Sequence, residues 1–567
     1  MDLDAKGSLG LWFLMGFYFM GFNREGVKVE INKMINKMSL DEKIGQVIMA
    51  GFSSVTANYC GYDEHIDILI TKYKIGNISL FARNIGSIEE ITKLNETIQK
   101  TMIEHIGIPA IIGTDQEGGM VTQVREGAVF FPGNMAVAAA NIEGSTLKEG
   151  EIVGQGLRAL GINLNIAPVL DVNTNPKNPI IGVRSYGDDP EKVAKLGVDF
   201  IKGIQSRGVI ATAKHFPGHG DTEIDTHVDI PTVPYDRERL ERVEFYPFRK
   251  AVENGVDAIM TAHIHFSAID DEKIPATLSY NILTKLLRND MGFKGIIMTD
   301  CMEMNAISKN FGIEKGSVMA IKAGADMIEI SHHLDVQIRS VEAIKEAVLN
   351  GEIPEERINE SVRRILEIKK KYGLFENPYP NLSKAKEVLN CKEYIEFARQ
   401  VSEKSVTLIR DRNKLIPLNV ADKKIVSISP EPKMFMGGIW EDVRKKYTLC
   451  EALRKEFGGK SIIIPFNPES GRTKEIVEEC EKADLVIIGV SNLNSNPGQL
   501  ELVNKISHLG KDVIVILLRD PYDVLLLEGI STCVCVYEHT PLAIESVIKV
   551  LKGEVKCEGV LPVKIEI

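Results

Sequence analysis

The sequence predicts a (β/α)8 barrel followed by a mostly parallel α/β sandwich domain. The first indication is that eight short β-branched runs alternate with amphipathic segments between Lys43 and Ser331. The second is that six more apolar runs alternate with helical segments beyond the proline- and asparagine-rich stretch LFENPYPNL. Strands that alternate with helices form parallel sheets, and eight such units close into a barrel. We therefore divide the chain into a hydrophobic N-terminal extension (1–26), a barrel (27–375), a linker (376–395) and an α/β sandwich (396–567).

The eight predicted barrel strands are separated by segments long enough for a helix. In chain order they are GQVIMAGF (45–52), IGNISLF (75–81), AIIGTD (110–115), INLNIAPVLDV (162–172), VIATAKH (209–215), AIMTAH (258–263), GIIMTD (295–300) and MIEIS (327–331). A Ser87/Glu90 capping box predicts the start of a helix after the second strand, and Pro190 predicts the start of another helix before the fifth strand. This order of elements is typical of a barrel.

The second domain is predicted from six apolar runs, SVTLIR, KIVSIS, KSIIIPF, ADLVIIGV, DVIVILL and STCVCVYE. Such continuous apolar runs are typical of strands that are buried on both faces. Because helical segments alternate with them, we expect a mostly parallel sheet covered by helices on both sides. No catalytic residue can be assigned to this domain from the sequence.

Composition and charge favour a globular protein and exclude a nucleic-acid groove. Hydrophobic residues make up 44% of the chain and charged residues 26%. The net charge of −11 comes from 79 acidic and 68 basic residues without a long basic run, so we expect no nucleic-acid partner. A small or neutral substrate fits this balance better. The eight cysteines are scattered, which favours reduced thiols over a disulfide framework.

The segment from Leu9 to Phe22 is an apolar run of signal-peptide length that is too short to span a bilayer. Asp2 and Asp4 outweigh Lys6 where a signal peptide needs net positive charge, and no small-residue cleavage site follows. We therefore expect a cytoplasmic protein without a stable membrane span. Secretion stays open as the alternative because the segment is so apolar.

Polar side chains gather at the carboxyl ends of the predicted barrel strands. In a barrel these ends meet on one face, and barrel enzymes place their chemistry there. Polar residues that end strands by coincidence would not be expected at the same end of so many successive strands. The residues concerned are Asp115, Asp171, Lys214, His215, His263 and Asp300.

The densest group of titratable residues is KHFPGHGDTEIDTHVDIP, which follows the fifth strand from Lys214 to Pro231. Asp225 and His227 are two residues apart, so in a turn the carboxylate can orient the imidazole and raise its basicity. A histidine held in this way can give and retake a proton. Gly218 and Gly220 are expected to let the loop move.

Asp300 ends the seventh strand and is predicted to project into the barrel mouth as a short, rigidly held carboxylate. Such a carboxylate suits a nucleophile that attacks an anomeric carbon while a second group protonates the leaving oxygen. The alternative for an aspartate between a strand and a helix is a helix N-cap, and for Asp300 taken alone the two readings are equally good.

Four motifs resemble glycoside hydrolase family 3: GTDQEGG, APVLDVNTNPKNPIIGVRSYGDDP, AKHFPGHGDTEIDTH and GIIMTDCMEM. The resemblance covers nearly the whole chain from about residue 30. The histidine loop is similar to the β-N-acetylglucosaminidase (β-N-acetylhexosaminidase) branch, whose members use an Asp-His dyad. The β-glucosidase branch takes its acid from a glutamate elsewhere. The resemblance thus implies a retaining, exo-acting glycosidase that releases terminal β-linked N-acetylglucosamine.

Matching positions assign roles by the same resemblance. Asp300 is expected to form the glycosyl-enzyme intermediate, His227 to act as acid/base and Asp225 to orient it. The expected substrate-binding residues are Asp115, Arg184, Lys214, His215 and, as a weaker candidate, His263. Asp171 and Glu117 are expected to pin loops by accepting backbone hydrogen bonds. We expect neither a cofactor nor a metal ion, and a small N-acetylglucosaminide as the substrate.

Met120 departs from the family pattern, which usually has arginine after DQEGG. No ion pair is expected at this position. Because Asp115 and the catalytic trio match, we expect an altered pocket wall rather than an inactive enzyme.

Four alternatives remain open at this stage. Two lie within the family: a β-glucosidase, or an N-acetylglucosaminide phosphorylase, since a near-neutral imidazole repels phosphate less than a carboxylate does. A sugar-binding protein that has lost turnover is the third. The fourth is a metal-dependent amidohydrolase built on His263, His265, His215, His219 and Asp300. The order of these residues along the strands disfavours the amidohydrolase. The natural substrate, whether a muropeptide, a chitin oligosaccharide or a glycoconjugate, is also left open.

Overall fold

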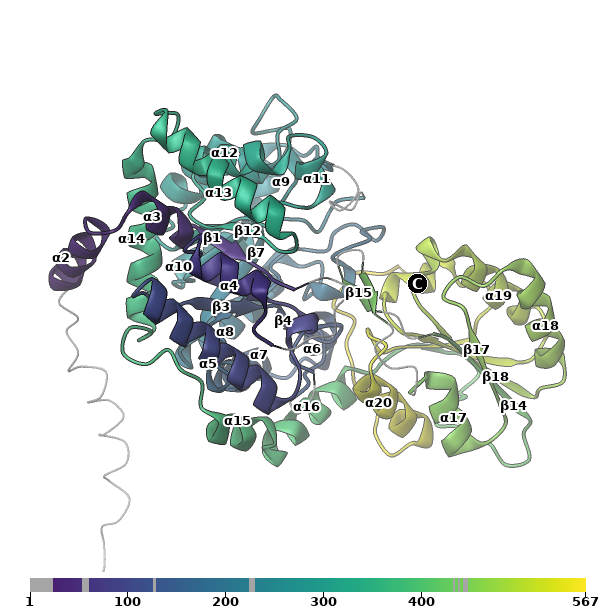
Figure 1. Ribbon diagram of the computed structural model, residues 1–567. Coiled ribbons are helices and arrows are strands. Elements are labelled where there is room, and N and C mark those ends of the chain that lie inside the picture. Colours follow the sequence, from purple (N-terminus) through teal and green to yellow (C-terminus); the bar gives the residue numbers. More distant parts are fainter. Residues whose placement is uncertain are drawn as a thin grey trace, which may run out of the picture.

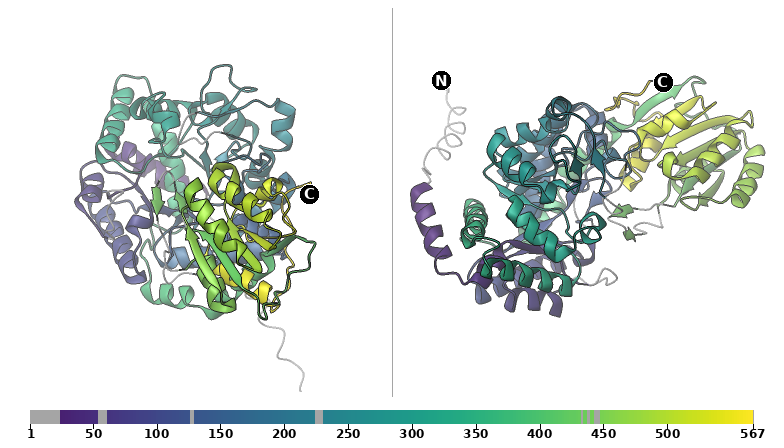
Figure 2. Two further views of the ribbon diagram at one scale, coloured as in Figure 1. Left: turned by 90° about the vertical axis from the view of Figure 1, so that its right-hand side faces the viewer. Right: turned by 90° about the horizontal axis from the view of Figure 1, so that it is seen from above.

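A computed structural model describes residues 24–53, 61–125, 129–223, 230–431, 434–436, 439–441 and 447–566. It shows a barrel and a smaller α/β domain beside it (Figure 1). Seen from above in Figure 2, the smaller domain projects from one end of the barrel rather than wrapping around it. The predicted fold class is confirmed.

All eight predicted barrel strands are present and parallel. They are β1 (Ile48–Ala50), β2 (Asn77–Leu80), β3 (Ile111–Thr114), β6 (Leu164–Asn165), β7 (Ile210–Phe216), β9 (Ala258–Thr261), β11 (Ile296–Met298) and β12 (Ile328–Ile330). From β1 to β11 each of these strands pairs with the next one named, and β12 pairs with β1. A bridge between Met298 and Met327 joins β11 to the start of β12, so the sheet closes into a barrel.

Amphipathic helices surround this barrel. In α5 the predicted Ser87 capping box is present, and Ile91, Ile98 and Met102 face the core. The helices of this part of the chain are α2 (Arg24–Ile35), α3 (Leu40–Gln46), α4 (Glu64–Thr71), α5 (Ile88–His105), α6 (Asn134–Ala140), α7 (Ser145–Ala159), α8 (Pro190–Ser206), α9 (Arg237–Arg242), α10 (Tyr246–Glu253), the π-helix η4 (Asn281–Asp290), α11 (Asn305–Ser308), α12 (Ile313–Ala323), α13 (Leu334–Leu349) and α14 (Glu355–Lys371).

The C-terminal domain contains the six predicted strands in one sheet of order β13-β20-β19-β18-β14-β17. Four pairings are parallel, and β13 runs antiparallel to β20. One face of the sheet packs against α18 and α19 and the other against α17 and α20. The elements are β13 (Thr407–Asp411), β14 (Ile425–Pro430), β15 (Met434–Met436), β16 (Ile439–Glu441), α17 (Leu449–Phe457), β17 (Lys460–Ile464), α18 (Ser470–Glu481), β18 (Leu485–Val490), α19 (Pro497–Ser507), β19 (Asp512–Leu517), β20 (Thr532–Cys535) and α20 (Pro541–Lys552).

The two domains are joined by helices rather than by an extended linker. The stretch 376–395, predicted as a linker, contains α15 (Leu382–Leu389) and the start of α16 (Lys392–Ser405). Helix α15 packs on α7, and α16 packs on α6 of the barrel and α20 of the second domain. Met135 and Ala136 of α6 belong to the same apolar cluster as the second sheet. The second domain is therefore packed directly against the barrel.

Most of the predicted N-terminal extension, 1–23, lies outside the described residues. Across the part of the chain that the structure does describe, no helix combines the length and apolar character needed to cross a membrane. The cysteines in this part, from Cys301 to Cys557, all carry free thiols.

Candidate active site

A cavity of about 320 Å³ opens at the carboxyl ends of the barrel strands. This is the size of pocket that small molecules occupy. Five of the predicted site residues line it: Asp115, Arg184, Lys214, His215 and Asp300. The fold thus brings together side chains that are as far apart in the sequence as Asp115 and Asp300, as expected for strand ends that meet on one face of a barrel.

Buried ion pairs hold one wall of the cavity. The Lys214 ammonium lies 2.6 Å from a carboxylate oxygen of Asp115 and 2.6 Å from one of Glu117. The Arg184 guanidinium binds both oxygens of Glu117, at 2.8 and 3.0 Å. Burial alone would raise the pKa of Glu117, but Arg184 and Lys214 outweigh it and lower that pKa to about 2. Glu117 thus orients two cations, whereas the sequence predicted that it accepts backbone hydrogen bonds.

Asp171 fixes the other side of the fifth strand's end. Its carboxylate is fully buried and accepts hydrogen bonds from the backbone N–H of His215 and of His219, the latter at 2.7 Å. A carboxylate oxygen also lies 2.7 Å from Nδ1 of His215. Asp171 therefore pins this loop as the sequence predicted. Burial lowers the pKa of His219 to about 4, so this ring is neutral at physiological pH.

Asp300 projects from the loop that follows β11. Its Oδ1 accepts a hydrogen bond of 2.7 Å from the backbone N–H of Cys301. His263 lies behind this loop and is 1% exposed. Its Nε2 is 3.0 Å from the carbonyl oxygen of Cys301, and its Nδ1 is 2.8 Å from the Thr277 hydroxyl. The structure therefore places His263 where it holds the backbone beside Asp300, outside the residues that line the cavity.

Glu329 is a lining residue that the sequence analysis missed. It lies within the short strand β12, is 4% exposed and borders the cavity. Burial, together with the nearby carboxylates of Asp115 and Asp300, raises its pKa to about 8. Glu329 is therefore mainly protonated at neutral pH and can donate a hydrogen bond. A glutamate inside an otherwise apolar strand was the available sequence signal.

The second domain also contributes to the cavity wall, through Arg519, Tyr537 and Glu538. Glu538 is buried and accepts a hydrogen bond of 2.8 Å from the backbone N–H of Gly133 in the barrel. Gly119 has a φ of +57°, and a Cβ atom there would lie 2.7 Å from the backbone of Gly133 as well as 2.4 Å from the Glu538 carboxylate, so only glycine fits. No local sequence pattern connects Glu538 with the barrel. The Gly118-Gly119 pair is a signal only that another part of the chain approaches closely there.

Asp225 and His227, predicted as the catalytic dyad, fall in the stretch 224–229, outside the described residues. The described start of their loop lies at the cavity, because His219 lines it. Asp221 is tied by hydrogen bonds from the hydroxyls of Tyr235, at 2.9 Å, and Thr174.

Gly218 and Gly220, expected to allow loop movement, have packing roles. A Cβ on Gly220 would lie 1.9 Å from the carbonyl oxygen of Val172, and one on Gly218 would lie 2.9 Å from Cβ of Glu244. Both positions therefore need glycine for a close approach of the chain.

Met120 lines the cavity, so the position at which the sequence departs from the family pattern lies in the cavity wall. Two of the four histidines of the amidohydrolase alternative, His263 and His265, lie outside the cavity lining. His263 contacts Thr277 and Cys301, and Nε2 of His265 lies 2.9 Å from the carbonyl oxygen of Asp270. Their ring nitrogens are thus engaged in structural hydrogen bonds.

Glu149 provides a prediction about stability. It is 1% exposed, and neither of its carboxyl oxygens has a hydrogen-bond partner among the described residues. Burial and the nearby Glu538 raise its pKa well above the usual value. The folded state therefore holds a proton that the unfolded state loses, and stability falls as the pH rises above about 4.5.

Glu149→Gln, which mimics the protonated acid, is expected to melt at a higher temperature than the wild type at pH 7. The difference should shrink toward pH 5, as measured by differential scanning calorimetry. The exposed Glu143→Gln serves as the matched control and should show no such trend. A Glu149→Gln variant that melts lower at neutral pH would refute a neutral buried carboxyl.

A charged pocket at the carboxyl ends of the strands of a (β/α)8 barrel is the architecture of a barrel enzyme. Residues 39–368 match the family model described as the glycosyl hydrolase family 3 N-terminal domain. The match covers more than half of the chain, which therefore belongs to glycosyl hydrolase family 3 and is a glycoside hydrolase.

Full-length relatives agree with this assignment. The chain is 28% identical to a protein named beta-hexosaminidase A from Pseudoalteromonas piscicida, over 93% of this chain and 97% of that protein. It is 26% identical to a beta-N-acetylglucosaminidase/beta-glucosidase from Cellulomonas fimi, over 94% of this chain and 95% of that protein. The structure of a family 3 beta-N-acetylglucosaminidase from Paenibacillus sp. str. FPU-7 superposes with a TM-score of 0.86 at 38% identity, covering 93% of this chain and 99% of that one. Both domains therefore have counterparts in these proteins.

Proposed function

We propose that the protein is a retaining, exo-acting β-N-acetylhexosaminidase that releases terminal β-linked N-acetylglucosamine. The observation that carries the proposal is that Asp300 lines the same cavity as the ion-paired Asp115 and Lys214. The choice of N-acetylglucosamine as the released sugar rests on the names of the relatives. The acid/base role is assigned to His227, with Asp225, in the loop after β7.

In this mechanism Asp300 attacks the anomeric carbon and forms a covalent glycosyl-enzyme intermediate. The Cys301 N–H holds one oxygen of Asp300, which fixes the direction of the carboxylate. His227, oriented by Asp225, protonates the leaving oxygen in the first step. In the second step it takes a proton from the water that releases the sugar.

The charged wall supports binding of a polar sugar. Lys214 binds one carboxylate oxygen of Asp115, and Asp115 borders the cavity. Its other oxygen can therefore accept hydrogen bonds from sugar hydroxyls. Arg184 and His215 border the same space, whereas Met120 offers an apolar surface. This mixture of a few fixed polar groups with apolar walls is typical of small-molecule sites.

The direct test compares nitrophenyl N-acetyl-β-glucosaminide with the matching β-glucoside. We expect faster cleavage of the N-acetylglucosaminide, and release of the sugar with its β configuration in a nuclear magnetic resonance time course. A preference for the glucoside would replace the proposal with the β-glucosidase alternative, and release of the α sugar would exclude a glycosyl-enzyme intermediate. Running the assay in phosphate buffer separates hydrolysis from phosphorolysis, since only the latter yields a glycosyl phosphate.

The acid/base role gives a second prediction. His227→Ala is expected to lose about 10²-fold or more on a substrate with a poor leaving group, because no group protonates the departing oxygen. On an aryl glycoside with a good leaving group, formation of the intermediate should be much less affected. Steady-state kinetics on both substrates measure the difference, and equal losses on both would contradict the assignment.

A further inference from the structure

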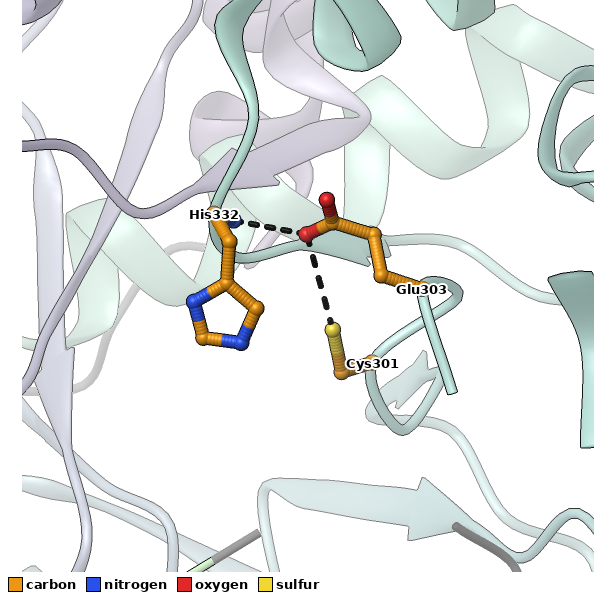
Figure 3. A group of neighbouring side chains, drawn as sticks. All are labelled: Cys301, Glu303 and His332. Atoms are coloured by element: carbon orange, nitrogen blue, oxygen red, sulfur yellow. Dashed lines mark hydrogen bonds between the residues drawn. The ribbon is translucent and has the colours of Figure 1, made fainter. Parts of the chain in front are cut away.

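A second group of potential ligands lies at the rim of the cavity beside Asp300. Cys301 and Glu303 lie in the loop after β11, and His332 follows β12. Figure 3 shows the Cys301 sulfur directed at the Glu303 carboxylate, with the ring of His332 next to them. One donor atom from each side chain lies within 4.8 Å of the other two. We propose that Cys301, Glu303 and His332 bind a thiophilic divalent cation such as Zn²⁺ or Cd²⁺.

The types of donor select this class of cation. A thiolate, an imidazole and a carboxylate suit zinc-like ions, whereas Mg²⁺ and Ca²⁺ prefer oxygen ligands alone. Bonds from Zn²⁺ to sulfur and nitrogen are about 2.3 and 2.0 Å, so neighbouring donors in a tetrahedral site are about 3.5 Å apart. The Cys301 sulfur lies 4.0 Å from a carboxylate oxygen of Glu303, so the donors have to move closer together when a cation binds.

The backbone around the group is already fixed. Glu303 accepts hydrogen bonds from the backbone N–H of His332, at 2.6 Å, and from that of His333, at 3.2 Å. The Glu303 side chain is 8% exposed, and its Oε1 also lies 2.6 Å from Nδ1 of His333. These bonds tie the two loops together. The Oε2 atom of Glu303 accepts one of these backbone hydrogen bonds, from His332, and its second lone pair can bind a cation while the loops stay tied.

Binding involves one proton. The thiol hydrogen leaves Cys301 to solvent as the sulfur–metal bond forms, while His332 binds through a neutral imidazole. The Cys301 thiolate and the Glu303 carboxylate then balance the charge of the cation, beside the buried Arg83 guanidinium. Three protein ligands leave a fourth position, and all three residues border the cavity.

Bound cation is expected to inhibit turnover, a consequence that rests on the proposed function. The backbone N–H of Cys301 donates to Asp300, so an ion bound at the Cys301 sulfur lies close to the nucleophile. Its positive charge stabilises the free carboxylate of Asp300 and thereby makes that carboxylate a weaker nucleophile. Binding itself does not depend on the activity.

The binding test titrates the full-length protein with Cd²⁺ and records the ultraviolet charge-transfer band of a cadmium–thiolate bond. We expect a saturable band in the wild type and in the control Cys391→Ser, which removes a half-buried thiol elsewhere. Cys301→Ser should lose the band, with Cys301→Ala as a second variant and circular dichroism as the check on folding. A band that persists without Cys301, or no band in the wild type, would overturn the proposal.

His332→Gln should weaken cadmium binding by about 100-fold or more, since loss of even an outer-shell partner costs 10- to 100-fold. Its matched control is His105→Gln, which removes an exposed imidazole at the end of α5 and should bind as the wild type does. Equal affinity of His332→Gln and the wild type would rule out the three-ligand site. Inhibition is then read as the ratio of activity with and without Zn²⁺ for each variant, so that a low basal rate is not mistaken for loss of the site.

Discussion

Asp300→Asn is expected to lower kcat/KM by about 10⁴-fold or more, the scale reached when a covalent nucleophile is removed from a hydrolase. The substitution keeps the size of the side chain and an oxygen that accepts the Cys301 N–H, so the melting temperature should stay close to that of the wild type. Steady-state kinetics with nitrophenyl N-acetyl-β-glucosaminide give the loss. The matched control is the exposed Asp271→Asn, which should retain wild-type activity.

Chemical rescue distinguishes a lost nucleophile from a distorted pocket. With Asp300→Ala, azide can enter the vacated space and attack the anomeric carbon, which yields an α-glycosyl azide. We expect azide to restore turnover of the activated substrate with this product. Wild-type rates in Asp300→Asn, without contaminating enzyme, would remove Asp300 from its role.

Glu117→Ala is expected to destabilise the fold by about 3 to 5 kcal/mol, because it leaves the buried charges of Arg184 and Lys214 without their shared partner. Urea unfolding measures this loss. The control Glu314→Ala removes a partner of the half-exposed Arg339 and should cost less than about 1 kcal/mol. A comparable small loss for Glu117→Ala would show that the network contributes little to stability.

The same network has a pH signature. The pKa of Glu117 in the folded protein, about 2, is below the usual value of 4.5. Its contribution is therefore fully present above pH 4.5 and is lost as the pH falls toward 2. In the Glu117→Gln variant, the free energy of unfolding measured in urea should therefore fall less steeply between pH 4.5 and pH 2 than in the wild type.

The fold followed from periodicity because each strand and each amphipathic helix leaves a local pattern. All the predicted strands were found, in an order that closes the barrel. Asp115, Lys214 and Asp300 were also predictable, since residues at strand ends converge wherever a barrel forms.

Other parts of the site depend on contacts that no local pattern encodes. Glu538 reaches the cavity only because the second domain packs against Gly119 and Gly133, more than four hundred residues earlier in the chain. The orientation of Glu329 into the barrel could not be read from MIEIS, because either face of a buried strand is apolar. The ring of His263 lies beside the Cys301 backbone rather than in the cavity lining, which its place at the end of a strand could not reveal.

In the proposed mechanism Asp300 becomes covalently linked to the sugar. The most direct measurement incubates the protein with a fluorinated N-acetylglucosaminyl fluoride, which forms the intermediate faster than it is hydrolysed. Intact-protein mass spectrometry followed by peptide mapping then locates the adduct. We predict a single adduct on the peptide that contains Asp300, absent from Asp300→Asn. An adduct on another residue, or rapid turnover of this compound through the α product, would show that Asp300 is not the nucleophile.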